Sequence, residues 1–420
     1  MKFSKKFICV LSMCLSFCTG GLASGDETYD KLKVLIDVME VINTNYVSET
    51  KPKDLVVGAI KGVVSALDPF SQYLENKVYK EMKNETEVSH DGSVGLHITV
   101  KNGFLTVVSP ISDTPAYRAG ILPGDKIVKI NNRSAITMSS GEAIGLMNDK
   151  TRKKVEITVS RDGVAKEIEF NLKRKKIKIE TVKTIMIEDG IVYIRLTEFN
   201  LQSVADIKKA LANYQQQGMK ALILDLRNNP GGLLDSAIDI ISMFIHDKKL
   251  VLSTEGRIEE VKREYITAGN GVFFEVPLVV LVNRGTASAS EIFSGAMQYY
   301  KRALIIGNNT FGKGSVQTVL SLPDGTALKL TVAKYYLPSG CPIDYSNEKN
   351  VKNGITPDIE IKVTMEEEIK LYAQGDVIFA RGKSFNANKV EDNVLNKAIE
   401  IIKENKIVED IASSTTLANK

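Results

Sequence analysis

The sequence predicts an α/β protein in which a β-rich module precedes a larger core, with helical segments at both ends. Apolar strands alternate with amphipathic helices over residues 176–365, a rhythm typical of an α/β core. Short alternating strands and glycine-marked turns fill residues 86–175. Apolar residues recur every three or four positions over residues 27–85, which indicates helices. The tail over about 366–412 is rich in Glu and Lys and is expected to be helical and to pack on the surface or against a partner.

The composition is that of an ordinary globular protein large enough for two or three domains. Of the 420 residues, 43% are hydrophobic and 25% are charged. The net charge is +4, but Lys2, Lys5 and Lys6 supply three of those charges, which leaves a body near +1. Charge therefore gives no reason to expect nucleic acid or a membrane surface as a partner.

The N-terminus has the pattern of a secretion signal, residues 1–24. A basic start is followed by an apolar stretch over residues 7–18 and by small residues around 21–24. The stretch is shorter than the roughly 20 residues that a membrane span needs. We therefore expect export to the periplasm or to the outer face of the cytoplasmic membrane, with an uncleaved anchor as the alternative. Only Cys341 lies outside this segment, so the mature monomer has no internal disulfide to form.

The elements follow in order along the chain. Residues 25–85 predict a pair of packing or dimerising helices. Within residues 86–175, a glycine-bearing loop at 92–95 leads into a strand, residues 114–120 predict a turn and short helix, and residues 122–125 predict a tight turn. The core of 176–365 alternates strands and helices, and the tail of 366–420 predicts a further helical segment with a frayed end. The core elements are expected at Ile191–Leu196, Ser203–Gln217, Ala221–Leu226, Leu233–Phe244 and Val276–Val282.

One segment combines features that an acyl-transfer nucleophile needs. The run from Leu281 to Ile292, LVNRGTASASEI, predicts a strand end, a turn of small residues and a helix start. Free N–H groups at a helix start can stabilise an oxyanion. Ser288 followed by Glu291 also fits a capping box, which taken alone is the simpler interpretation. Ser290 and Ser294 compete with Ser288 as candidate nucleophiles.

A base for such a serine is harder to find. His90, His97 and His246 lie in separate segments far from the serine motif, which disfavours a Ser-His-Asp triad. Lys313 stands between two glycines, in the run TFGKGSVQ, and could serve as a base if its pKa were lowered. A lysine in a turn is the alternative. A phosphate loop is disfavoured, because Gly314 stands where a metal-binding Ser or Thr is required.

Residues 86–175 resemble a PDZ domain. The likeness rests on Gly95, Leu96, His97 and Ile98 as a carboxylate-binding loop and strand, and on the glycine-marked turns that follow. In such a domain the loop amides bind a peptide's C-terminal carboxylate and the strand edge pairs with its main chain.

The longer chain resembles the carboxy-terminal processing peptidases, also called tail-specific proteases. The motif around Ser288 matches the family's nucleophile, and the motif around Lys313 matches its general base. The resemblance implies that Gln317 orients the lysine and that amides of Gly231, Gly232 and Ala289 form the oxyanion hole. Glu291 matches a position that the family favours, although a capping role suffices to explain it.

The resemblance also implies a crotonase-like protease core, substrates with accessible protein C-termini, and no cofactor or metal. An adaptor protein, or a homo-oligomer formed through the helical termini, is compatible with it. Two other classes remain as alternatives: an inactive PDZ scaffold that binds without turnover, and a crotonase-type acyl-CoA enzyme, which would not explain the export signal. The chain departs from the family pattern at Cys341 and at the charged stretch 344–352.

Overall fold

The computed structural model describes residues 23–68, 70–84, 93–101, 103–136, 138–149, 151–175, 180–344, 353–374, 377–379 and 390–404. Almost all of the predicted signal segment lies outside the described residues, as do His90 and nearly all of the charged stretch 344–352. No helix within the described ranges combines the length and apolar character that crossing a bilayer requires. The chain divides into two compact units, residues 1–67 and 68–420.

The first unit contains the two helices predicted for the N-terminal region, α1 (Ala23–Asn45) and α2 (Pro52–Ser65). Pro52 occupies the first turn of α2, where its missing N–H costs no hydrogen bond. Apolar side chains on α1 remain exposed to solvent, among them Tyr29, Leu32, Val34, Ile36 and Val41.

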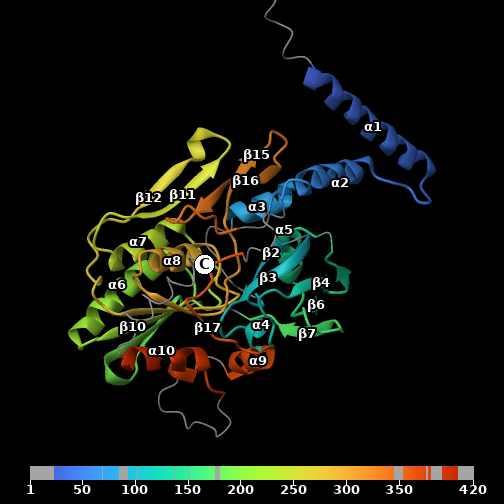
Figure 1. Cartoon of the computed structure of the whole chain (residues 1–420). Coiled ribbons are helices and arrows are strands. Elements are labelled where there is room, and N and C mark those ends of the chain that lie inside the picture. The colour runs from blue at the N-terminus through green and yellow to red at the C-terminus, as the bar shows by residue number, and fades with distance from the viewer. Residues whose placement is uncertain are drawn as a thin grey trace, which may run out of the picture. The chain divides into compact units, whose positions relative to one another are not determined.

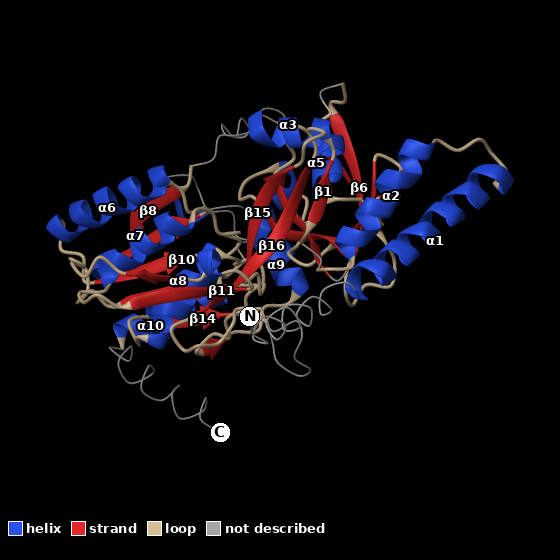
Figure 2. Cartoon of the chain, turned by 90° about the horizontal axis from the view of Figure 1, so that it is seen from above, coloured by secondary structure: helices blue, strands red, loops and turns tan. Residues whose placement is uncertain are grey.

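Among its described residues, the second unit holds three sheets and the remaining helices (Figures 1 and 2). Its strands are β1 (Gln72–Leu74), β2 (Leu96–Lys101), β3 (Phe104–Pro110), β4 (Lys126–Ile130), β5 (Arg133–Ser134), β6 (Lys154–Ser160), β7 (Ile168–Lys173), β8 (Val182–Met186), β9 (Ile191–Leu196), β10 (Ala221–Asp225), β11 (Leu250–Gly256), β12 (Arg263–Ile266), β13 (Leu278–Val282), β14 (Leu304–Gly307), β15 (Ser315–Ser321), β16 (Ala327–Tyr336) and β17 (Ile359–Glu360). Its α-helices are α3 (Asn76–Asn84), α4 (Pro115–Arg118), α5 (Ser140–Met147), α6 (Leu201–Gln216), α7 (Leu234–Phe244), α8 (Ala289–Tyr299), α9 (Met365–Gln374) and α10 (Asn393–Lys403).

The central sheet has the order β17-β14-β13-β10-β9-β8 and is parallel except for β8. Helices α6, α7 and α8 cover one face, and α10 covers the other (Figure 1). Because both faces are buried, the strands are almost continuously apolar. Strands β10 and β13 are neighbours in register, with Asp225 opposite Leu281, so the loops at their carboxyl ends meet at one edge of the sheet.

A second, antiparallel sheet has the order β1-β16-β11-β12, with β15 also paired to β16. It corrects the prediction that residues 27–85 are helical throughout, because Gln72–Leu74 forms a strand on β16. Tyr73 and Leu74 are buried there. Pairing with a distant strand decides this conformation, and no local pattern in residues 72–74 could show it.

The β-rich module is a separate antiparallel sheet of order β2-β3-β4-β6-β7, with β5 on β4. Thr114 caps the predicted short helix α4. The predicted turn at 122–125 is held by Asp125, which accepts the Leu122 N–H at 2.9 Å. Arg161 pairs with Asp125 at 2.6 Å, and both side chains are buried. The module therefore has its own core and a buried ion pair that fixes its turn.

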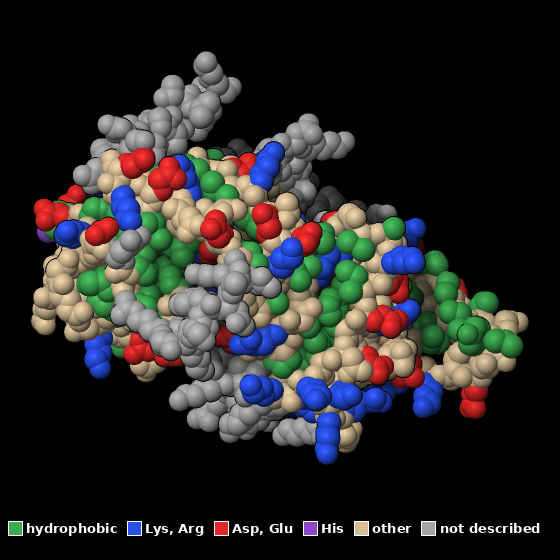
Figure 3. Space-filling view, turned by 90° about the horizontal axis from the view of Figure 1, so that it is seen from below, with side chains coloured by type: hydrophobic (Ala, Val, Ile, Leu, Met, Phe, Trp, Pro, Cys, Tyr) green, Lys and Arg blue, Asp and Glu red, His purple; other side chains and the backbone are tan. Residues whose placement is uncertain are grey.

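The C-terminal tail contributes to the core of the second unit. Val394, Ala398 and Ile401 of α10 are buried against the central sheet. Seen from the side of α9 and α10, the surface mixes charged and hydrophobic side chains (Figure 3).

Candidate active site

Ser288 occupies the turn between β13 and α8, as the sequence predicts. Its backbone has φ 56° and ψ −119°, a left-handed conformation that is strained for a residue with a side chain. An ordinary N-cap residue is extended, so Ser288 is not a simple cap. A strained strand-to-helix turn is also how hydrolases of the nucleophile-elbow type expose a serine.

The competing serines are unsuitable as nucleophiles. Ser290 and Ser294 are both fully buried. The Ser290 hydroxyl donates to the Asn229 carbonyl at 3.1 Å, and the Ser294 hydroxyl donates to the Ser290 carbonyl at 2.8 Å. Ser288 is partly exposed, so of the three it is the serine that a substrate can reach.

The serine turn is fastened to the loop that follows β10. The Thr286 hydroxyl donates to the Leu226 carbonyl at 2.9 Å, and the Ala287 N–H donates to the Asn229 carbonyl at 3.0 Å. Asn228 and Asn283 exchange a further pair of hydrogen bonds, at 2.9 and 3.0 Å. These contacts fix the turn relative to residues 226–232, which we call the oxyanion loop.

Gly231 brings the oxyanion loop directly against the serine. A Cβ at Gly231 would lie 2.8 Å from both the Ala287 carbonyl oxygen and the Ala289 nitrogen, and 2.9 Å from Ser288 Cβ. The Gly231 N–H already donates to Asn229 Oδ1 at 2.9 Å. Ala289 begins α8, so its N–H has no acceptor within the helix. Of the predicted oxyanion donors, the Gly231 N–H is thus already engaged, whereas the Ala289 N–H has no acceptor within its helix.

Glu291 joins the serine turn to the lysine loop, residues 310–314. One carboxylate oxygen accepts the Ser288 N–H at 2.8 Å and the Lys313 N–H at 2.9 Å. The other oxygen accepts the Thr310 hydroxyl at 2.6 Å and the Gly312 N–H at 2.7 Å. Burial raises the pKa of Glu291 above its usual value, against the effect of these hydrogen bonds. The sequence suggested only a capping role for Glu291, because its contacts with the lysine loop are long-range.

Lys313 lies in an environment that favours the neutral amine. Burial lowers its pKa from 10.5 to about 8, the positive charge of Lys329 lowers it as well, and Glu291 opposes them. The pKa of Lys329 is itself lowered by burial. A lysine with a pKa near 8 can act as a base close to neutral pH.

The ammonium group of Lys313 and the hydroxyl of Ser288 are not hydrogen-bonded to each other within the described residues. Gln317 lies on β15, four residues after Lys313, with its amide nitrogen buried and without a hydrogen-bond partner in the described part of the chain. The structure therefore brings the backbones of the two motifs together without a direct contact between their reactive atoms.

The predicted peptide-binding residues lie where a peptide could add to a sheet. Gly95 has φ 85° and leads into β2, which carries Leu96, His97 and Ile98 and forms one edge of its sheet. From the end of β2, Lys101 donates to the Phe311 carbonyl at 2.8 Å. Val108 of β3 packs with Phe311 and with Ala287. The β-rich domain thus touches both the serine turn and the lysine loop.

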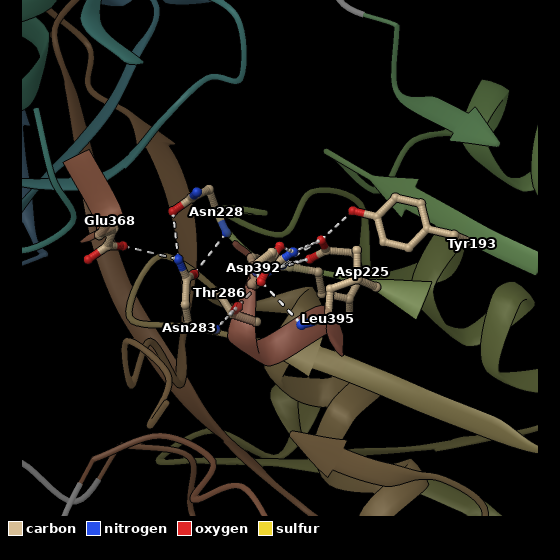
Figure 4. Close-up of polar contacts among 10 residues, drawn as sticks. Tyr193, Asp225, Asn228, Asn283, Thr286, Glu368, Asp392 and Leu395 are labelled. Atoms are coloured by element: carbon tan, nitrogen blue, oxygen red, sulfur yellow. Dashed lines mark hydrogen bonds and ion pairs between the residues drawn. The ribbon is translucent and has the colours of Figure 1, made fainter. Parts of the chain in front are cut away.

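A buried polar cluster behind the oxyanion loop was not predicted from the sequence. Arg227 binds Asp225 at 2.6 Å and Asp392 at 2.8 Å, and Tyr193 donates to Asp225 at 2.6 Å (Figure 4). Burial would raise the pKa of Asp225, but the charges of Arg227 and Arg195 hold it below its usual value. The cluster ties the start of α10 to the end of β10. The run DLR at 225–227 places an aspartate near an arginine in the sequence. Asp392, the other partner of Arg227, lies 165 residues later.

Comparison with known families agrees with this arrangement. Residues 190–361 match the model of peptidase family S41, and residues 92–172 match the PDZ domain. Residues 19–78 match the activating protease CtpB N-terminal domain.

Individual relatives cover most of the chain. A carboxy-terminal-processing protease of Bartonella bacilliformis is 38% identical over 350 residues, which is 82% of this chain and 78% of the relative. The carboxy-terminal processing protease CtpA of Bacillus subtilis is 35% identical over 375 residues, covering 89% and 77%. Among solved structures, a photosystem II D1 C-terminal processing protease matches with a TM-score of 0.65 and 29% identity, covering 79% of this chain and 92% of that one.

Proposed function

This chain belongs to the carboxy-terminal processing proteases of peptidase family S41, and on that premise we propose that it cleaves through a dyad of Ser288 and Lys313. One observation carries the proposal. The Glu291 carboxylate accepts hydrogen bonds from the backbone N–H of both residues, and so joins two motifs that lie 25 positions apart in the sequence. The pKa of about 8 at Lys313 supplies a base that is partly neutral in neutral solution.

In the proposed mechanism, neutral Lys313 takes the proton of Ser288 as the serine oxygen attacks the scissile carbonyl carbon. The amides of Gly232 and Ala289 donate to the oxyanion. The tetrahedral intermediate collapses, and Lys313 returns the proton to the leaving amine. Water then attacks the acyl-enzyme while Lys313 accepts its proton. The bond between the acyl carbon and the Ser288 oxygen breaks, Lys313 returns the proton to that oxygen, and the new C-terminal carboxylic acid leaves. Gln317 is proposed to orient the lysine side chain when substrate is bound.

Substrate selection is proposed to begin at the PDZ domain. The C-terminal carboxylate of a protein substrate would bind the amides of the loop at Gly95, and its last residues would pair with the edge of β2 along Leu96, His97 and Ile98. Lys101 contacts the lysine loop from the other end of β2, and Val108 of β3, which lies beside His97 and Ile98, packs on Phe311 of the same loop.

Two further parts of the proposal rest on the ends of the chain. Export is proposed from the basic and apolar pattern of residues 2–24. A homo-oligomer formed through the helical termini is proposed from the exposed apolar side chains of α1, and an adaptor protein is the other partner compatible with them.

The test uses an unfolded reporter protein with an apolar C-terminus and a matched reporter with a charged one. The wild-type chain should cleave the apolar reporter faster. Ser288→Ala should bind the reporter without measurable cleavage, because removal of a nucleophile eliminates nearly all turnover. Equal cleavage by the wild-type chain and by Ser288→Ala would contradict the assignment of Ser288. Binding without cleavage by both would instead support the inactive PDZ scaffold.

A further inference from the structure

Helix α9 connects the PDZ domain to the oxyanion loop through one side chain, Tyr372. Its ring stacks on Tyr117 of the PDZ helix α4, with centroids 4.2 Å apart and planes inclined by 15°. Leu122 of the PDZ domain completes the same buried cluster. Tyr372 is itself almost fully buried, so the position of its ring is fixed by the PDZ domain.

The hydroxyl of Tyr372 lies beside the oxyanion loop. It is 2.7 Å from Asn228 Oδ1 and 2.9 Å from Glu368 Oε1, and both oxygens are acceptors for its single proton. Asn283 Nδ2 donates to the same Asn228 oxygen at 3.0 Å and lies 3.4 Å from the Glu368 carboxylate (Figure 4). Four side chains thus form one hydrogen-bond network, in which Glu368 is half-buried and the other three are buried.

Asn228 is the residue of the oxyanion loop that this network holds. It has φ 61°, a left-handed conformation that asparagine adopts more readily than most residues with a side chain. Its N–H donates to Asn283 Oδ1 at 2.9 Å, and the Gly285 N–H donates to the same oxygen at 3.0 Å. A shift of Asn228 would therefore move the oxyanion loop relative to the serine turn.

Asn228 is buried, but on the side of α9 it lies at the wall of a cavity. A cavity of about 440 Å³ opens there, and Asn228, Asn283, Glu368 and Tyr372 all contribute to its lining. A side chain at the wall of a cavity lacks the neighbouring atoms that fix buried residues. Its hydrogen bonds must then supply the restraint.

We infer that Tyr372 is a positioning residue for catalysis. Its hydroxyl holds the oxyanion loop in position through Asn228, and its ring couples that position to the PDZ domain. The inference rests on the proposed function, because it assigns the loop after β10 to the oxyanion hole. It concerns no reacting atom, since Tyr372 acts through Asn228.

The test compares Tyr372→Phe with Tyr300→Phe. The first variant keeps the ring stack and removes the hydroxyl. The second removes a tyrosine hydroxyl that donates to the Leu250 carbonyl at 2.8 Å, away from the loop. Hydrogen–deuterium exchange at residues 226–233 should become faster in Tyr372→Phe and stay at the wild-type rate in Tyr300→Phe. Exchange at the wild-type rate in Tyr372→Phe would overturn the inference, whatever the activity of the protein.

Activity supplies the second readout. Tyr372→Phe should lower kcat about tenfold, the effect of one hydrogen bond, with KM changed by less than about twofold. The pH midpoint of kcat should stay at the wild-type value, because Lys313 is not disturbed. Wild-type kcat in Tyr372→Phe, or an equal loss in Tyr300→Phe, would also overturn the inference. If exchange becomes faster in Tyr372→Phe but the wild-type chain cleaves no reporter, the proposed protease function is wrong. The positioning of the oxyanion loop by Tyr372 would still hold.

Discussion

The serine turn and the lysine loop are fastened to the rest of the protein in different ways. Thr286, Ala287 and Asn283 each bond the serine turn to the oxyanion loop, so several independent contacts fix that relation. By contrast, three donors of the lysine loop end on the single carboxylate of Glu291. The Phe311 N–H, which donates to the Thr286 carbonyl at 3.0 Å, adds one direct bond.

This difference indicates which of the two loops a single substitution can displace from the serine. Removing one contact of the serine turn leaves others to hold it against the oxyanion loop. Removing the Glu291 carboxylate takes away most of what aligns the lysine loop with the serine. The serine turn and the oxyanion loop are therefore joined by several contacts, whereas among the described residues the lysine loop is joined to them mainly through Glu291 and by the bond from Phe311.

The largest effect is expected from loss of the base itself. Lys313→Met keeps the length of the side chain and removes the amine, so kcat/KM should fall by about 10²–10⁴-fold. Lys329→Met, at the neighbouring buried lysine, is the matched control and should retain turnover at high pH. Steady-state cleavage of the apolar reporter measures both.

Folding of Lys313→Met can be checked by thermal unfolding. The folded-state pKa of Lys313 lies below 10.5, so near pH 7 the unfolded chain binds its proton more tightly than the folded one. The lysine therefore costs stability in full below pH 8, and this cost falls as the pH rises from about 8 toward 10.5, so Met should raise the Tm at pH 7. Full activity in Lys313→Met would remove the lysine from the mechanism.

A smaller loss is expected from Glu291→Gln. The amide keeps one acceptor oxygen and places an NH₂ group against one pair of the four donors, so about two hydrogen bonds are lost. We expect kcat to fall about 10- to 100-fold, with little change in KM. The variant to compare with it is Asn283→Ala, which removes a contact between the serine turn and the oxyanion loop. If Asn283→Ala lowers kcat more than Glu291→Gln does, the contrast between the two loops is wrong.

The smallest effects concern the pH dependence. Because the base must be neutral, kcat/KM should rise with pH through a midpoint near 8 and then level off. Lys329→Met removes a positive charge that lowers the pKa of Lys313, so its midpoint should move up. Glu291→Gln removes a negative charge that raises this pKa, so its midpoint should move down. A rate profile from pH 6 to 10 measures all three, and shifts of the opposite sign would contradict the assignment.

Much of the site could be predicted from the sequence because its motifs are local. The strand, turn and helix around Ser288 follow from a run of a dozen residues, and the glycines beside Lys313 mark its loop. The family resemblance selected Ser288 over Ser290 and Ser294, and the structure adds a physical reason, the complete burial of the other two. The positive φ of Ser288 likewise has no sequence signal, since serine is common at helix starts.

The parts that could not be predicted are long-range. Glu291 is three residues from Ser288, so a cap explained it, and its bonds to the lysine loop depend on how β13 and β15 are placed. Tyr372 and Asp392 lie in a tail that the sequence indicated as a surface segment or a partner contact. Their contacts with Asn228 and Arg227 span 144 and 165 residues, beyond the reach of any periodicity.

Ser288 is proposed to attack with Lys313 as its base, and the rate of covalent labelling by a serine-reactive fluorophosphonate tests this assignment most directly. Peptide mass spectrometry should locate the adduct on Ser288, and the labelling rate should rise with pH through about 8. Labelling should be at least about 10²-fold slower in Lys313→Met. An adduct on Ser290 or Ser294, or equal labelling of wild type and Lys313→Met, would contradict the claim.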